Sequence, residues 1–356
     1  MLALAARGSW RLFCVLMQSP GHMLLATQRV SAKMLHGRRT KPNTKITVAG
    51  AGSVGLACSA FLIDRQLTNH LVLMDRRDKW LEASAVDLQA ATKGLSGSLK
   101  VEICSDGAKT KNSKYVVIAA GERAQPGQSR LQLAQATANA VKQLLPKLLH
   151  YNPRATYVVA SSPADLMTWL LQELSGLPKE RCISAGCHLD SILFRYLIAQ
   201  RMGVAASAVN GFIIGEHGNC CVPVWSGVSV GGISLQRLMP EVGSEHDKEQ
   251  WQTVHRQVQR MANQVARDET YTNWGIGISV SDIIGAMQQN LGHVLSVGGN
   301  IQGLMGITDS VVLSLPSVLG ANGIKQMIEL PLSELEMSLL EQSAESLVKT
   351  QQQIQL

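Results

Sequence analysis

The stretch from Lys45 to Asp75 constrains the fold more than any other part of this chain. The apolar residues 46–48 lead into the glycine-rich segment 50–55 (GAGSVG), and apolar side chains then recur at helical spacing as far as Asp64. A second apolar run, 71–74, ends at Asp75. This order predicts a strand, a tight turn, a helix and a second strand.

Each glycine of the segment has a mechanical role. Gly50 allows the turn, Gly52 lets the backbone approach a pyrophosphate at the helix N-terminus, and Gly55 lets the helix pack closely on the strand. Asp75 is placed to accept hydrogen bonds from adenosine ribose hydroxyls. A loop that merely turns the chain would explain the glycines alone, but strand, helix and carboxylate together favour a dinucleotide site.

The carboxylate also favours NAD over NADP, because Asp75 would repel a 2′-phosphate. Arg76 and Arg77 follow it directly and leave that preference open. The cofactor contacts predicted from this unit are Gly50, Gly52, Ser53, Val54, Gly55 and Asp75.

The positive charge of the chain is concentrated at its N-terminus. Eight of the 33 basic residues precede the first acidic residue, Asp64, so the remainder holds 25 basic against 26 acidic residues. The neutral body argues against a nucleic-acid partner. Residues 1–43 are rich in Arg, Leu, Ala and Ser, which is typical of a mitochondrial transit peptide. A secretory signal, a disordered basic arm, a start at Met23 and a cytoplasmic location remain alternatives.

Length and cysteine usage set further bounds. A chain of 356 residues with 46% hydrophobic residues can bury a large core and favours two domains. The seven cysteines are odd in number and lack metal-ligand spacing, so we expect a reducing compartment and no metal site. No apolar run is long enough to span a membrane.

Strands and helices alternate through the first half of the chain. Strands are predicted at 115–119 and 156–160, and helices at 80–92, at 131–150 and from about 164. This alternation predicts an α/β, doubly wound parallel (Rossmann) sheet for residues 44–186. The polar segment 121–130 between a strand and a helix is expected to be a lid over the cofactor. The pattern changes beyond Gly186, which predicts a second, α+β catalytic domain over 187–356.

The segment GEHGNCCVPVWSG at 215–227 resembles the catalytic segment of L-lactate dehydrogenases. The resemblance runs from Lys45 to the C-terminus, through DLQ at Asp87, PGQSR before Leu131, GCHLDS at Gly186, DKEQWQTVH at Asp247 and YTNW at Tyr271. It implies a two-domain, tetrameric protein of lactate metabolism that exchanges hydride between NADH and a 2-oxo acid.

The resemblance also implies roles for individual residues. His217 would give the proton to the carbonyl, Asp190 would orient it, and Arg130 would close over the substrate and polarise the carbonyl. Two further site residues would be Thr272, which lines the pocket, and Arg123, which contacts a cofactor phosphate. Gly121 and Ser162 complete the expected cofactor contacts.

Three substrate positions depart from the family pattern. Leu193 stands where lactate dehydrogenases carry the arginine that clamps the substrate carboxylate, and Arg195 should point away from that place. Ser162 replaces an asparagine, and its shorter hydroxyl supplies one donor instead of two. Ala124 stands where lactate dehydrogenases carry a glutamine and malate dehydrogenases an arginine.

Three hypotheses follow for the function. The first is an NAD-dependent lactate dehydrogenase-like enzyme, acting on a small 2-oxo or 2-hydroxy acid with weakened carboxylate binding. The second is a catalytically impaired member, a pseudoenzyme that binds NAD(H) as a structural or regulatory subunit. The third is a reductase of neutral carbonyls. We expect a homotetramer, or a mixed tetramer with related subunits.

The leader gives the first testable prediction. If residues 1–43 are a transit peptide, the mature protein isolated from mitochondria begins close to residue 44, because the presequence is removed after import. N-terminal sequencing of that protein checks this. A mature protein that begins at Met1 or Met23 would contradict it.

Overall fold

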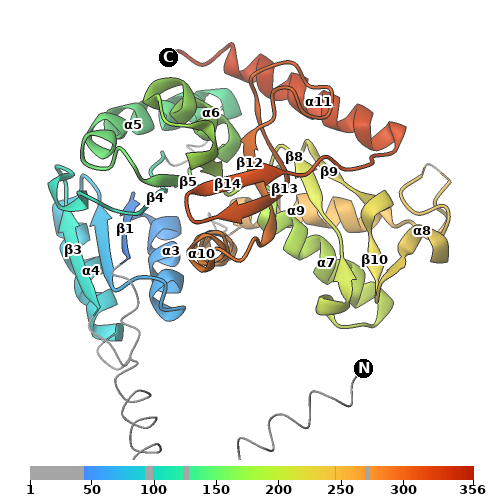
Figure 1. Ribbon diagram of the computed structural model, residues 1–356, viewed down its shortest axis with the longest axis horizontal. Coiled ribbons are helices and arrows are strands. Elements are labelled where there is room, and N and C mark those ends of the chain that lie inside the picture. Colours follow the sequence, from blue (N-terminus) through green and yellow to red (C-terminus); the bar gives the residue numbers. More distant parts are fainter. Residues whose placement is uncertain (1–43, 93–98, 123–127, 245, 269–272) are drawn as a thin grey trace, which may run out of the picture. The chain divides into compact units, whose positions relative to one another are not determined.

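The computed structural model describes residues 44–92, 99–122, 128–244, 246–268 and 273–356. Thr44–Leu356 forms one compact unit. The predicted fold class is confirmed: a mixed α/β architecture is built on a large sheet whose first half is parallel (Figure 1). The predicted division at residue 186 stays a prediction. No helix among the described residues is long and apolar enough to cross a membrane.

The first six strands form the parallel half of the sheet. They lie in the order β3-β2-β1-β4-β5-β6, the doubly wound order that reverses direction beside β1. The strands are β1 (Lys45–Ala49), β2 (His70–Met74), β3 (Lys100–Cys104), β4 (Tyr115–Ile118), β5 (Thr156–Val159) and β6 (Cys182–Ser184). The sequence predicted four of these strands, β1, β2, β4 and β5, and both ends of each lie within two residues of the predicted ones.

Alternate residues along each strand point to opposite faces of the parallel half of the sheet, and both faces are buried. Ile46 and Val48 belong to one apolar cluster, whereas Ala49 belongs to the other, as the period of two along a strand requires. The first cluster is closed by α3 (Ser53–Asp64) and α10 (Asn273–Gln289), which pack on each other. The second is closed by α5 (Arg130–Tyr151), α6 (Ala164–Ser175) and α11 (Glu334–Gln351) (Figure 1).

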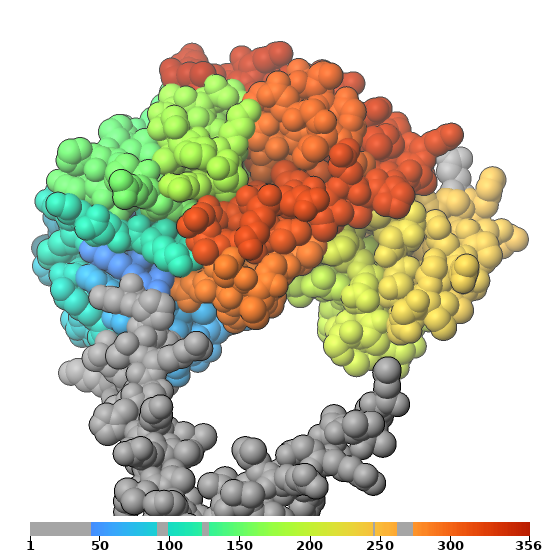
Figure 2. All heavy atoms as spheres, viewed as in Figure 1, coloured from blue at the N-terminus to red at the C-terminus, as the bar shows by residue number. Residues whose placement is uncertain are grey.

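The antiparallel half continues the same sheet. β6 is followed by β12 (Val294–Asn300), β13 (Val312–Gly320), β8 (Ile213–Gly215) and β9 (Cys221–Pro223), with β14 (Gly323–Met327) on β13. In the space-filling view, the orange and red segments of the last third lie directly against the green ones of the first half (Figure 2). Strands from the middle and the last third of the chain thus complete the sheet that the first six strands begin.

A smaller part of the chain packs beside this sheet. β7 (Val209–Asn210), β10 (Ser229–Val230) and β11 (Ile233–Ser234) form a three-stranded antiparallel sheet. A third apolar cluster joins it to α7 (His188–Met202), α8 (Leu235–Leu238) and α9 (Gln252–Asp268). Helix α4 (Asp78–Thr92) packs on β3 at the opposite edge of the large sheet. The structure also holds single turns of 3-10 helix at Ala108–Thr110, Lys179–Arg181, Ala206–Ala208 and Trp225–Gly227.

Backbone contact between the first strand and α3 leaves no room for a side chain at Gly55. A Cβ there would lie 1.8 Å from the carbonyl oxygen of Gly50, whereas one at Gly52 would meet nothing within 4 Å. Gly55→Ala is therefore expected to lower the free energy of unfolding by about 1–3 kcal/mol or more, despite the better helix propensity of alanine.

Gly52→Ala is the matched control and should leave the melting temperature nearly unchanged. Thermal unfolding of the full chain and both variants is the measurement. Equal melting temperatures for all three proteins would contradict the packing described for Gly55.

Candidate active site

A cleft of about 470 Å³ opens where the first strand meets α3. Its lining includes seven of the nine predicted cofactor contacts: Gly50, Gly52, Ser53, Val54, Asp75, Gly121 and Ser162. Gly55 lies behind the turn, against the backbone of Gly50. Arg123 lies outside the described residues, as do the predicted substrate residues Ala124 and Thr272.

The glycine turn suits a pyrophosphate. Gly50 has a left-handed φ of 102°, and its amide donates to the carbonyl oxygen of Met74 at 2.7 Å, which holds the turn against β2. Gly52 precedes α3 and has no side chain that could cap the helix, so the first backbone N–H groups of α3 can donate hydrogen bonds to a ligand. Because a Cβ at Gly52 would stand in open space, this is the place where a phosphate can approach the backbone.

Asp75 at the end of β2 faces this turn. Its Oδ2 accepts a hydrogen bond from the amide of Ala51 at 2.9 Å, which ties the carboxylate to the glycine segment. Arg77 also binds this carboxylate, with Nε to Oδ1 and Nη2 to Oδ2 both at 2.9 Å. The sequence shows that the two residues are neighbours, but this pairing is visible only in the structure.

His217 and Asp190 meet in the interior, although 27 residues separate them in the chain. His217 lies in the loop after β8 and Asp190 in the first turn of α7; the distance from Nδ1 to Oδ2 is 2.6 Å. Asp190 is almost fully buried, whereas a quarter of the His217 side chain is exposed. The negative charge of Asp190 raises the pKa of His217 to about 9, against the opposing effect of burial. The imidazole is therefore protonated at neutral pH and can donate a proton.

A second carboxylate holds the histidine loop, and sequence reasoning missed it. Asp165, in the first turn of α6, accepts the backbone amide of His217 at 2.8 Å through Oδ2 and the Ser184 hydroxyl at 2.6 Å through Oδ1. Burial raises the pKa of Asp165. The only signal in the sequence is an acidic residue just after a strand and a proline, which many helix starts share.

Two further charged groups lie beside the histidine. Burial raises the pKa of Glu216 to about 7. Arg130 begins α5, after the capping residue Ser129, so it belongs to a helix and not to the end of a loop. Its Nη2 would lie 3.8 Å from a Cβ placed at Gly218, which brings the guanidinium to the histidine loop. Arg130 can thus reach a carbonyl held at His217.

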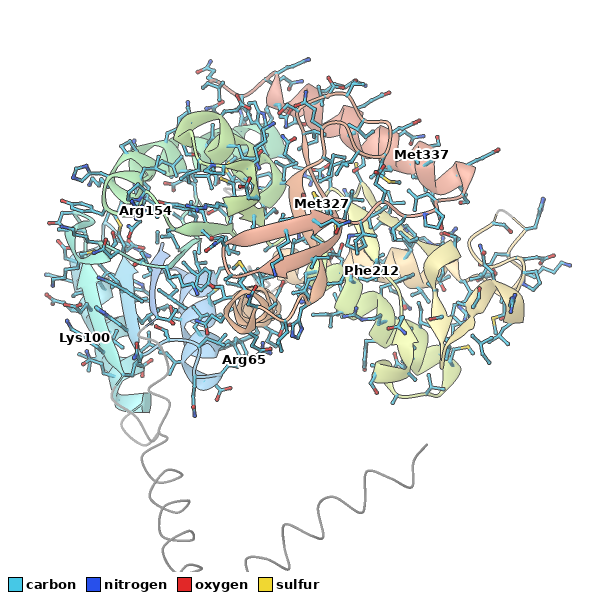
Figure 3. The ribbon with its side chains drawn as sticks, in the orientation of Figure 1. Arg65, Lys100, Arg154, Phe212, Met327 and Met337 are labelled. Atoms are coloured by element: carbon cyan, nitrogen blue, oxygen red, sulfur yellow. The ribbon has the colours of Figure 1, made fainter. Side chains whose placement is uncertain are left out.

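Helix α7 holds Leu193, which stands at the expected binding place of the substrate carboxylate, and its neighbour Arg195. Leu193 is partly buried and packs against the third apolar cluster, which contains Phe194 and Trp225. Arg195 is also half-buried and interacts electrostatically with Asp282 of α10. Asp282 in turn binds His188 at 3.2 Å and Arg65, which Figure 3 labels at the end of α3. Arg195 is therefore engaged at the packing of α7 on α10.

The cysteines near the histidine contribute to packing. Cys221 is buried, and its Sγ lies 3.4 Å from Nε2 of His255 on α9. Burial raises the pKa of Cys221, so the thiol stays protonated. Within the described ranges, no group of three or more His, Cys, Asp or Glu side chains is arranged to hold a metal ion.

Comparison with known proteins identifies the family. Residues 44–184 match the family model described as lactate/malate dehydrogenase, NAD binding domain, and residues 187–355 match its alpha/beta C-terminal domain. The chain belongs to the lactate/malate dehydrogenase family. NAD is its cofactor, and the open space at Gly52 fits the pyrophosphate. Members of this family are NAD-dependent 2-hydroxy acid dehydrogenases.

Individual relatives cover almost the whole chain. The L-lactate dehydrogenase B chain of Sus scrofa is 42% identical over 325 residues, which is 91% of this chain and 97% of the relative. The B chain of Homo sapiens is 41% identical over the same shares. That of Fundulus heteroclitus is 41% identical over 90% of this chain and 96% of the relative.

The histidine–aspartate pair generates a pH prediction. Asp190→Asn should lower the pKa of His217 from about 9 toward its ordinary value of 6.5, because the largest charge that opposes burial is removed while Asp165 and Glu216 remain. NMR titration of the imidazole resonances measures this. Asp309→Asn, an exposed site elsewhere, is the control and should leave the titration near 9.

The raised pKa of His217 also determines how the free energy of unfolding changes with pH. Because the folded pKa of His217 exceeds the unfolded one, its stabilising effect is complete below about pH 6.5 and is lost as pH rises through about 9. The difference in free energy of unfolding between the parent and Asp190→Asn should narrow over that window. Titration of His217 near 6.5 in the parent would contradict the pairing.

Proposed function

We propose that this chain reduces the C2 carbonyl of small 2-oxo acids such as pyruvate, and oxidises the matching 2-hydroxy acids, while holding the substrate carboxylate weakly. The observation that carries the proposal is the hydrogen bond between His217 and Asp190, with the histidine protonated at neutral pH. A ketone becomes an alcohol when it gains a hydride at carbon and a proton at oxygen. NADH supplies the hydride when bound.

The chain's own residues supply the proton and the polarisation. Nδ1 of His217 is engaged by Asp190, so Nε2 holds the proton that passes to the carbonyl oxygen. Asp190 keeps the imidazole in this orientation and stabilises its charged form. The guanidinium of Arg130 draws electron density toward the carbonyl oxygen. In the reverse direction, the neutral His217 takes the proton back from the alcohol.

The weakened hold on the substrate rests on Leu193. Its apolar side chain stands three residues after Asp190 on α7 and packs against hydrophobic neighbours, so it offers no charge to a carboxylate. Loss of one partner of a buried charge pair costs about 3–5 kcal/mol, which corresponds to roughly 10²–10⁴ in affinity or rate. Pyruvate is therefore a poor substrate in this proposal.

A second candidate function is an NAD(H)-binding subunit that no longer turns over. The electrostatics of the site favour it, because Asp165, Asp190 and Glu216 place three carboxyl groups around His217. Because Leu193 is uncharged, a substrate carboxylate beside it would find little positive charge to offset the repulsion from these carboxyl groups. In this case the fold would serve structure or regulation.

We propose further that the chain assembles into a homotetramer, or a mixed tetramer with related subunits, in mitochondria. The basic leader supports the location. The relatives are named as B chains. Exposed apolar side chains on two helices support assembly: Val86 of α4 and Trp274 of α10 are 65% and 63% exposed.

NADH oxidation by saturating pyruvate tests the proposal. The full chain should be slow, and Leu193→Arg should raise turnover by at least about tenfold, because it restores a cation for the carboxylate. Gln200→Arg adds the same charge at an exposed site of the same helix and should change nothing.

The outcomes separate the two candidate functions. Restored turnover in Leu193→Arg alone supports the enzyme with a missing clamp. If neither protein turns over while both bind NADH, the non-catalytic subunit is the better account. Rapid turnover by the parent would contradict the role given to Leu193.

A further inference from the structure

The hydrogen bonds around Asp75 leave it little capacity for a ribose. Oδ1 accepts from the backbone amide of Arg77 at 3.1 Å and from its Nε at 2.9 Å; Oδ2 accepts from the amide of Ala51 and from Nη2 of Arg77, both at 2.9 Å. A carboxylate has about four lone-pair sites, and the protein itself fills all four here. The two hydroxyls of an unmodified ribose find no free acceptor unless Arg77 moves.

The same contacts neutralise the carboxylate. Burial pushes the pKa of Asp75 upward, but the hydrogen bonds from Arg77 and Ala51 outweigh it, and the pKa lies below its ordinary value. The group is thus a carboxylate paired bidentately with a guanidinium. The repulsion by which Asp75 would exclude a 2′-phosphate is largely cancelled.

Arg77 is held in this place by a second set of contacts. Its guanidinium carbon lies 5.4 Å from the centre of the Trp80 ring, within the range of a cation–π interaction. Nε1 of Trp80 donates to the carbonyl oxygen of Ala51 at 2.5 Å, and Nη2 of Arg77 lies 3.4 Å from the same oxygen. The guanidinium therefore stands between the glycine turn and the first turn of α4, at the mouth of the cofactor cleft.

A second guanidinium lines the same end of the cleft. The side chain of Arg76 is 79% exposed and forms an ion pair from Nη2 to Oε1 of Glu122 at 3.2 Å. Exposed pairs of this kind contribute little to stability, so Arg76 can leave Glu122 for a stronger acceptor. A dianionic phosphate is such an acceptor, because guanidinium binds it through parallel hydrogen bonds.

We propose that the adenosine end of this cleft accepts a 2′-phosphate on Arg76 and Arg77, so that the chain binds NADP(H) as well as NAD(H). Arginine beside the ribose is the chemistry by which dinucleotide folds accommodate the 2′-phosphate. Asp75 then acts as the anchor that positions Arg77 and no longer as the group that excludes the phosphate.

Equilibrium binding to the full chain, without any oxo substrate, tests the proposal apart from turnover. Nicotinamide fluorescence gives the dissociation constants of NADH and NADPH, and calorimetry compares 2′,5′-ADP with 5′-ADP. We expect NADPH to bind within about tenfold of NADH. We also expect 2′,5′-ADP to bind at least as tightly as 5′-ADP.

Two variants assign the effect to the arginines. Arg76→Ala and Arg77→Ala should each weaken NADPH binding by about 10- to 100-fold, as expected for a lost charge-assisted contact. Arg76→Ala should weaken NADH binding by much less, whereas Arg77→Ala should tighten it, because Asp75 is then free to accept hydrogen bonds from the ribose. Lys79→Ala is the charge-matched control, since Lys79 is exposed in the first turn of α4, two residues after Arg77, but does not line the cleft, and it should leave both affinities unchanged.

Three results would overturn the proposal. The first is NADPH binding more than about 100-fold weaker than NADH in the parent. The second is an equal loss of affinity for NADH and NADPH in the arginine variants, which would mean that the two arginines support the cleft without contacting the 2′-phosphate. The third is failure of the full chain to bind either nucleotide.

Discussion

The hydrogen bond between His217 and Asp190 is the interaction on which the chemistry of this structure depends. It joins the loop after β8 to the first turn of α7, and Asp165 of α6 holds the same loop through the backbone amide of His217. Two buried carboxylates from different helices thus fix one imidazole. The pairing sets the charge of His217 as well as its position, and it makes the imidazole a proton donor.

The catalytic residues and the lining of the cofactor cleft differ in their charges. Three carboxyl groups surround the catalytic histidine, and Leu193 offers a substrate carboxylate no cation. At the adenosine end of the cofactor cleft, Arg77 neutralises Asp75 and Arg76 pairs with Glu122. In the proposed function, the proton donor of a 2-hydroxy acid dehydrogenase is kept, while the charges that bind the substrate carboxylate and the adenosine ribose differ from the family pattern.

The fold could be predicted from the sequence because it depends on local patterns. Apolar runs and the glycine spacing predicted β1, β2, β4 and β5 and most of the helices of the parallel half, and their alternation predicted a doubly wound parallel sheet. The short strands β3 and β6 were not predicted. The place of Asp165 could not be predicted, because its contact with His217 spans 52 residues and depends on how α6 packs. The bond from Arg77 to Asp75 depends on a rotamer, which no pattern of residue types specifies.

In the proposed function, His217 can donate its proton, while no cation clamps the substrate carboxylate. The most direct measurement compares kcat/KM for pyruvate and for pyruvamide, its uncharged amide, with NADH and the full chain. We predict that both are reduced and that the two values agree within about tenfold, because no cation distinguishes them. A preference for pyruvate of more than about 100-fold, or reduction of neither compound, would contradict the account.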